Sequence, residues 1–147
     1  MKHLNLTNNN FRAVLPMPMA ELSALQKLLL DMNGFTGEIL EAFSSLTELT
    51  ILDLWGNKLS GSIPVWIWQH QKLKILYLYG NGLIEELSCN ITMVNLIKID
   101  LWANKLTGCI PEDFGTLKKP TIIILYINEF IGPIPRSIDF IPNLQYI

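Results

Sequence analysis

The sequence carries little charge and has no excess of basic residues. Of its 147 residues, 16% are Asp, Glu, Lys or Arg, and the formal net charge is −2. Ordinary soluble domains contain about 25% of these residues. A protein that binds nucleic acid needs clustered Lys and Arg to neutralise phosphates. The charge balance therefore excludes a nucleic-acid partner.

Long hydrophobic runs are also absent. One of the longest, IIILYI, covers residues 122–127, whereas a membrane-spanning helix needs about 20 apolar residues. We therefore expect no membrane segment in this chain. The first residues after Met1 are mostly polar, with an Asn run where a secretory signal has an apolar core. We expect no signal peptide in them.

What the sequence does contain is one pattern that repeats along its whole length. An Asn recurs at steps of 24, 24, 24, 23 and 24 residues, at Asn9, Asn33, Asn57, Asn81, Asn104 and Asn128. Apolar residues stand five and three places before each Asn, and Leu or Phe stands two places after it. This is the leucine-rich repeat pattern, which predicts an α/β-type solenoid with a parallel β-sheet on its concave face.

We expect a single domain, 1–147, that consists of six repeats. Their bounds are 1–24, 25–48, 49–72, 73–95, 96–119 and 120–143, and Leu144 opens a seventh. Each repeat begins with a short strand whose Leu side chains alternate with outward-facing ones. Because one strand cannot bury its own apolar face, successive coils stack and share a core. We interpret the recurring Asn as a ladder whose side-chain amides pair backbone groups inside the fold.

The second half of several repeats contains a further motif. LSGSIP (59–64), LTGCIP (106–111) and FIGPIP (130–135) share it. The motif resembles the plant-specific class of leucine-rich repeats, which implies a second short strand and a 3₁₀ turn on the convex side. Repeat four departs from it, because residues 83–95 contain no Gly or Pro and the repeat is one residue short. We expect a local irregularity there.

Longer stretches resemble one receptor family. LTGCIPEDFGTLKK (106–119), LIKIDLWANKLTG (96–108) and RSIDFIPNLQ (136–145) are similar to the ectodomain of HAESA-like receptor kinases of plants. The resemblance implies a single-pass receptor at the plasma membrane with its repeats on the extracellular face. It also implies a secreted peptide ligand on the concave face, often with a smaller co-receptor repeat protein, and a cytoplasmic Ser/Thr kinase.

The kinase part of this resemblance does not carry over to the chain. The sequence has no Gly-rich loop, no HRD and no DFG, which are signatures of kinase catalysis. The Arg pair with which the family binds a peptide carboxylate is also missing, because no Arg lies among the strand positions. We therefore expect a peptide- or protein-binding module and not an enzyme.

The repeat register locates the binding surface. The seventh places of the six repeats read Thr7, Asp31, Trp55, Tyr79, Trp102 and Tyr126. The fifth places read Asn5, Leu29, Asp53, Tyr77, Asp100 and Ile124. Exposed aromatic patches mark interaction sites, although aromatic side chains on adjacent strands also support a sheet. We predict ligand contact by Trp55, Tyr79, Trp102, Tyr126, Tyr77, Asp53 and Asp100.

The candidate catalytic groups are few. His3 and His70 have no Ser or Cys at a catalytic spacing. Asp53 and Asp100 lie two strands apart, or roughly 9–10 Å, which suits an inverting carboxylate pair. A flat open sheet offers no water-excluding cleft, however, so we expect neither catalysis nor a cofactor or metal.

Several expectations concern the ends and the surface of the array. Neither terminus carries an atypical capping repeat, so we expect uncapped apolar ends, self-association, and a piece of a longer array. Asn90 and, less favourably, Asn5 lie in glycosylation sequons. Cys89 and Cys109 lie on adjacent repeats at different places, which permits a disulfide without indicating one. Two alternatives to a receptor module stay open: a secreted protein resembling polygalacturonase inhibitors, and a non-functional receptor remnant.

Overall fold

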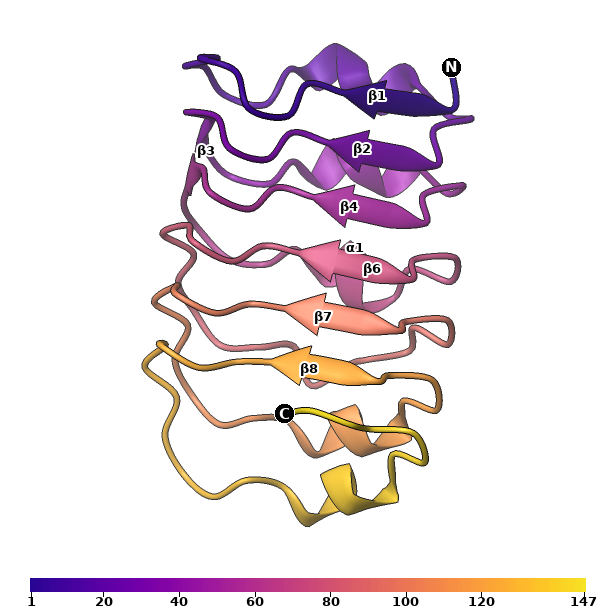
Figure 1. Ribbon diagram of the computed structural model, residues 1–147, viewed down its shortest axis with the longest axis vertical. Helices are drawn as coiled ribbons and strands as arrows, with labels where there is room; N and C mark the ends of the chain where they lie inside the picture. Colours follow the sequence, from indigo (N-terminus) through magenta and orange to yellow (C-terminus); the bar gives the residue numbers. More distant parts are fainter.

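The concave face of the molecule is one parallel sheet of six short strands. A computed structural model describes all residues from 1 to 147. The strands are β1 (His3–Asn5), β2 (Lys27–Leu29), β4 (Ile51–Asp53), β6 (Ile75–Tyr77), β7 (Lys98–Asp100) and β8 (Ile122–Ile124). They pair in chain order, so each repeat adds one strand beside the previous one (Figure 1). The predicted solenoid with a parallel sheet is confirmed.

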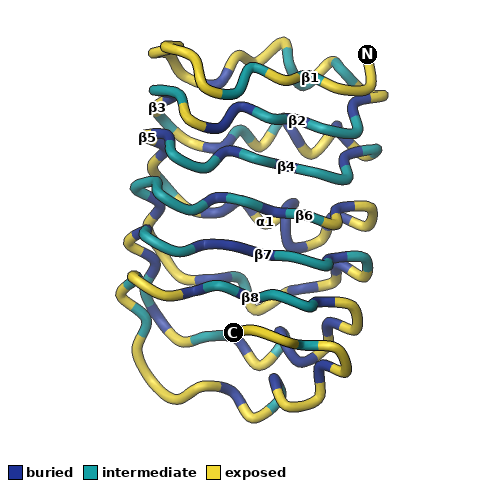
Figure 2. The backbone as a smooth tube through the Cα atoms, in the orientation of Figure 1, coloured by how far each residue is buried: buried dark blue, intermediate teal, exposed yellow.

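The sheet register follows the Asn spacing. Leu28 of β2 pairs with Leu52 of β4, which pairs with Leu76 of β6. The middle residues of these three strands are fully buried, while the residues on either side of them are partly exposed (Figure 2). The inward side chains, mostly Leu and Ile, form one core cluster of 33 buried residues that runs through all the coils. This continuous burial is what holds the stack together.

The Asn ladder closes each strand as expected. The Asn57 side-chain amide donates to Leu30 O and Leu54 O, both at 3.0 Å, and its Oδ1 accepts the Phe35 N–H at 3.0 Å. Asn33, Asn81, Asn104 and Asn128 make the equivalent bonds. Each Asn therefore joins its own coil to the coil before it.

The convex side consists of short extended segments followed by single helical turns. Strands β3 (Thr36–Gly37) and β5 (Lys58–Leu59) pair in parallel. Five turns lie behind the sheet (Figure 1): η1 (Met17–Glu21), η2 (Glu41–Ser45), α1 (Val65–Trp68), η3 (Glu112–Thr116) and η4 (Arg136–Phe140). This arrangement confirms the second strand and the 3₁₀ turns that the LxGxIP motif predicts.

Repeat four has no such helical turn, and the predicted irregularity is confirmed. Its convex segment from Leu83 to Asn95 contains only one isolated bridge, between Glu86 and Thr107. Trp68, at the end of α1 in repeat three, is 1% exposed and packs edge-to-face against Phe114 of repeat five, with ring centroids 6.0 Å apart. The Trp68 side chain of repeat three thus occupies the volume that a helical turn of repeat four would fill.

The two cysteines do not form a disulfide, because Cys89 and Cys109 are both exposed and unpaired. An open apolar pocket of about 420 Å³ lies at the last coil, where Leu125, Tyr126 and Tyr146 are among its lining residues. Self-association through this surface stays a prediction, which light scattering of the 147-residue chain tests. None of the helices is long and apolar enough to cross a membrane.

Candidate ligand-binding face

The four predicted aromatic residues form a continuous stack across the concave sheet. Their main chains extend the sheet beyond the strands, because Gly56 N–H donates to Tyr79 O and Gly80 N–H donates to Trp102 O, each at 3.0 Å. The ring centroids are 4.9 Å apart from Trp55 to Tyr79, 5.5 Å from Tyr79 to Trp102, and 5.4 Å from Trp102 to Tyr126. The interplanar angles are 10°, 17° and 14°. The structure therefore brings the predicted column together.

The stacking limits which parts of the four rings are able to contact a ligand. Because the inner ring faces cover one another, the stack supports the sheet, as the alternative interpretation holds. Trp55, Tyr79 and Trp102 are nevertheless only partly buried, and Tyr126 is 53% exposed. All four residues thus keep part of their surface accessible to solvent, Tyr126 the most.

Tyr77 stands beside the stack, between two carboxylates. The register pairs Asp53 of β4 with Tyr77 of β6, and Tyr77 with Asp100 of β7. The rings of Tyr77 and Tyr79 meet at 69° with centroids 6.2 Å apart, so they form a corner. The structure thus places Asp53, Tyr77 and Asp100 in one row next to the aromatic column.

The carboxylates of this row lie in a partly desolvated environment. Burial and, to a smaller extent, the charge of Asp31 raise the pKa of Asp53 to about 7, against a weaker lowering by the Trp55 N–H. Burial also raises the pKa of Asp100, which accepts the Trp102 N–H at 3.2 Å. These shifts follow from removing charged oxygens from water without an opposite charge nearby.

The same charges act on the tyrosines. Burial raises the pKa of Tyr79 to about 12, with further contributions from Asp53, Asp100 and Asp31. Burial and the charges of Asp53 and Asp100 also raise the pKa of Tyr77. Both phenols therefore stay protonated at neutral pH and are able to donate hydrogen bonds.

Asp31 is a member of this face that the sequence interpretation left out. It precedes Trp55 in the seventh-place column, is 6% exposed, and accepts the Thr7 hydroxyl at 2.7 Å. Its place in the seventh-place column indicates this position, but the prediction for that column included only its aromatic residues. Its charge extends the acidic row to the N-terminal edge of the aromatic stack.

The two sequons lie on opposite sides of the molecule. Asn5 belongs to β1 on the concave face, and its Oδ1 accepts the Thr7 N–H at 2.9 Å. Asn90 is exposed in the irregular convex segment of repeat four, where its N–H donates to Ser88 Oγ. Asn5 and Asn90 are both exposed, so the two positions differ in the face on which they lie.

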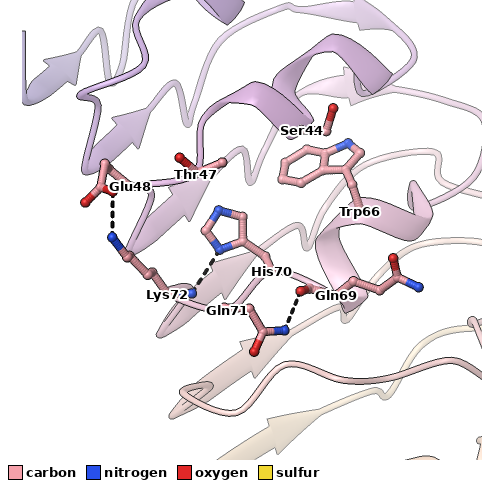
Figure 3. Close-up of a pocket in the computed structure, with 8 residues that line it drawn as sticks. All are labelled: Ser44, Thr47, Glu48, Trp66, Gln69, His70, Gln71 and Lys72. Atoms are coloured by element: carbon pink, nitrogen blue, oxygen red, sulfur yellow. Dashed lines mark hydrogen bonds and ion pairs between the residues drawn. The ribbon is translucent and has the colours of Figure 1, made fainter.

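A pocket of about 420 Å³ on the side of repeats two and three was not predicted (Figure 3). His70 lies in it at a position that other repeats fill with Leu, such as Leu46. Its Nε2 is 3.1 Å from Leu46 O, and its Nδ1 accepts the N–H groups of Lys72 and Leu73. Lys72 is paired with Glu48. Nε1 of Trp66, which also lines the pocket, is buried without a hydrogen-bond partner. Because the ring nitrogens of His70 and the charge of Lys72 are satisfied within the chain, we assign these two residues a structural role. The chain contains no group of three or more His, Cys, Asp or Glu side chains arranged to hold a metal ion.

Comparison with known proteins defines the class. Three segments, 24–46, 48–70 and 95–117, match the Leucine Rich Repeat family model. Each covers a coil whose strand and Asn ladder are described above. The fold of the chain is the leucine-rich repeat solenoid.

The comparisons also confirm the resemblance to plant receptors. Receptor-like protein 39 of Arabidopsis thaliana is 32% identical over 97 residues, which are 65% of this chain and 11% of that protein. The ectodomain of the Arabidopsis thaliana receptor kinase GASSHO1/SCHENGEN3 gives a TM-score of 0.95 at 34% identity, over 99% of this chain and 18% of that one. The ectodomain of the Arabidopsis receptor kinase HAESA gives 0.96 at 28% identity, over 100% of this chain and 25% of that one. The chain therefore spans a small part of the proteins that it resembles.

Proposed function

We propose that this chain is a ligand-binding part of a plant receptor ectodomain and that its concave face binds an extended peptide or protein segment. The observation that carries the proposal is the stacked column of Trp55, Tyr79, Trp102 and Tyr126, which remains partly or largely exposed on the concave sheet. Trp and Tyr dominate binding hot spots because they supply large contact areas with few torsions to fix.

The dimensions of the face fit a short peptide. Six strands at a spacing of about 4.8 Å give a strip roughly 25–30 Å long, and an extended peptide advances about 3.3 Å per residue. The strip thus accommodates roughly eight residues that run across the strands. Lys98, Asp53 and Asp100 beside the column are charges that fix the direction of such a peptide.

The similar proteins support a receptor origin over a secreted inhibitor. The GASSHO1/SCHENGEN3 structure is a complex with CASPARIAN STRIP INTEGRITY FACTOR 2, and the HAESA structure is a complex with an IDA peptide hormone. By analogy we propose a peptide ligand, an extracellular location, a co-receptor repeat protein as a further partner, and no enzymatic activity in this chain. The resemblance covers the repeat array alone, so this part of the proposal is analogy.

The experiment measures peptide binding by the 147-residue chain and by Trp55→Ala and Trp102→Ala variants. A random octapeptide library is selected on the wild-type chain, and the affinities of the selected peptides are measured by fluorescence anisotropy. We expect each substitution to weaken binding about tenfold or more, as loss of an aromatic hot spot does. Phe140→Ala, an exposed aromatic on the convex turn η4, is the matched control. Unchanged affinity in folded Trp variants would show that the column is only a scaffold.

We further propose Asn90 as the glycosylated residue and Asn5 as a secondary one. Asn90 lies on the convex side, where a glycan leaves the sheet free, whereas a glycan on Asn5 covers the concave face. Expression through the secretory pathway, followed by mass spectrometry of wild type and Asn90→Gln, tests this assignment. Loss of the main glycan in Asn90→Gln supports it, and a main glycan on Asn5 contradicts it.

A further inference from the structure

The acidic row beside the aromatic stack has no positive partner in the chain. Asp53 and Asp100 lie on β4 and β7, Asp31 follows β2, and Asp31 and Asp100 are 6% and 9% exposed. The only salt bridge of the molecule joins Lys72 and Glu48 on another side. The Asp100 carboxylate accepts one hydrogen bond within the chain, from the Trp102 N–H. Charges with little exposure are normally paired, and these carboxylates have no countercharge in the chain.

The aromatic geometry at the same place independently fits a cation. Tyr77 and Tyr79 meet at 69° and form a two-walled corner. Ring faces attract cations within about 6 Å, and pairs of aromatic walls recur where proteins bind such groups. Asp53 and Asp100 flank Tyr77 on the neighbouring strands, at about 4.8 Å to either side. A cation over Tyr77 would therefore have a carboxylate on each side of it.

A guanidinium group satisfies these contacts better than an ammonium group. It is planar and stacks on an aromatic ring while its edge donates several hydrogen bonds in fixed directions. An ammonium group is a compact, strongly hydrated charge and is less suited to a flat, half-buried corner. Lys98, which lies on the same strand as Asp100, makes no salt bridge with it and does not fill this place.

We infer that the ligand of the concave face carries an arginine side chain that lies on Tyr77, between the carboxylates of Asp53 and Asp100. This inference rests on the proposed function, because it names the chemistry of the peptide that the same face binds. Asp31 adds negative charge at the next strand and steers the guanidinium toward the row. The neighbouring ligand residues then lie along the edges of Trp55 and Trp102.

The test uses two octapeptide sublibraries that differ in one fixed central residue, arginine or citrulline. Citrulline keeps the shape of arginine without the charge. We expect the arginine sublibrary to bind the 147-residue chain at least tenfold more tightly, since charge-assisted hydrogen bonds to a buried carboxylate are about twice as strong as neutral ones. In Asp53→Asn/Asp100→Asn this preference should fall to about one, because Asn retains the acceptor for the backbone N–H but has no charge.

A matched control keeps the change in net charge constant. Glu85→Gln/Glu86→Gln removes two charges from an exposed convex segment and should leave the arginine preference intact. Equal binding of the two sublibraries, with an affinity that still falls in Trp55→Ala, overturns the arginine inference and leaves the proposed function standing. No binding of either sublibrary overturns both. An arginine preference that persists in the double Asp variant places the cation elsewhere and overturns the site.

Discussion

Repeats four (73–95) and five (96–119) are neighbours in the solenoid, and they differ on one side only. On the concave side, β6 and β7 pair in register, and Asn81 and Asn104 make equivalent bonds to the preceding coils. On the convex side, repeat five has η3, whereas repeat four has no helical turn. Separate residues therefore determine the two sides of a coil. A repeat that has lost its convex helical turn still keeps its strand and its Asn ladder.

The difference persists because a neighbouring repeat compensates for it. Trp68 of repeat three reaches past repeat four to Phe114 of repeat five, and its carbonyl accepts the N–H groups of Thr92 and Met93 at 2.9 and 3.1 Å. The Trp68 side chain thus fills the volume of the missing turn, while its main-chain carbonyl orders the irregular segment. Four predictions test this division of roles, from the largest expected effect to the smallest.

Removal of the compensating side chain should have the largest effect. Trp68→Ala leaves a cavity beneath repeat four and should lower the free energy of unfolding by about 3–5 kcal/mol, as large-to-small core substitutions do. Urea unfolding followed by circular dichroism measures the loss. Phe140→Ala, which truncates a side chain that is 73% exposed, should change stability by less than about 0.5 kcal/mol. Similar small losses in both variants would mean that Trp68 does not support repeat four.

The second prediction concerns the Asn ladder, which closes the strands of the concave sheet. Asn104 is 8% exposed, donates to Leu78 O and Leu101 O, and accepts the Leu83 N–H. Asn104→Ala leaves the buried Leu83 N–H unpaired and removes one donor from each carbonyl, although Leu78 O and Leu101 O keep their bonds from Asn81 and Asn128. The loss should be about 3 kcal/mol. Asn9→Ala is the matched control, because Asn9 is exposed and bonds only within its own coil; its loss should be about 1 kcal/mol. Equal losses at the two positions would argue against the inter-coil bonds as the source of stability.

Asn104 and Trp68 also show how far the sequence could predict the structure. Asn104 belongs to a strict period, and the same period predicted the strands, their register and the aromatic column. Trp68 belongs to no period, because its role depends on a gap in the next repeat and on Phe114 beyond it. The candidate face divides in the same way. Spacing located Trp55 and Tyr79, whereas the face-to-face stacking and the charge of the acidic row depend on rotamers and burial.

The acidic row gives a third, pH-dependent prediction. The pKa of Asp53 is about 7 in the fold against an ordinary value of 3.8, so between these values the folded state binds more protons than the unfolded state. Stability from this group is therefore highest near pH 4 and is lost as the pH rises through 7. Because the side chain is partly solvent-exposed, screening reduces the loss to about 1–2 kcal/mol. Chemical unfolding from pH 4 to 8 should show a flatter profile in Asp53→Asn than in wild type. An unchanged slope would contradict an uncompensated charge at Asp53.

The smallest expected effect concerns the backbone at the start of the irregular segment. Glu85 stands where other repeats have the glycine of LxGxIP and has a φ of 74°, close to the 71° of Gly108 in repeat five. A non-glycine residue in this left-handed region is strained by about 1–2 kcal/mol, and glycine removes that strain at some cost in chain entropy.

Glu85→Gly should therefore stabilise the chain by about 0.5–1 kcal/mol, which thermal unfolding can resolve. Glu86→Gly is the matched control. Glu86 does not share the positive φ, so the same change one residue later should destabilise by about the same amount. If Glu85→Gly were also destabilising, the convex backbone of repeat four would owe its conformation to contacts of the Glu85 side chain. The two sides of the coil would then be less independent than the comparison of repeats four and five indicates.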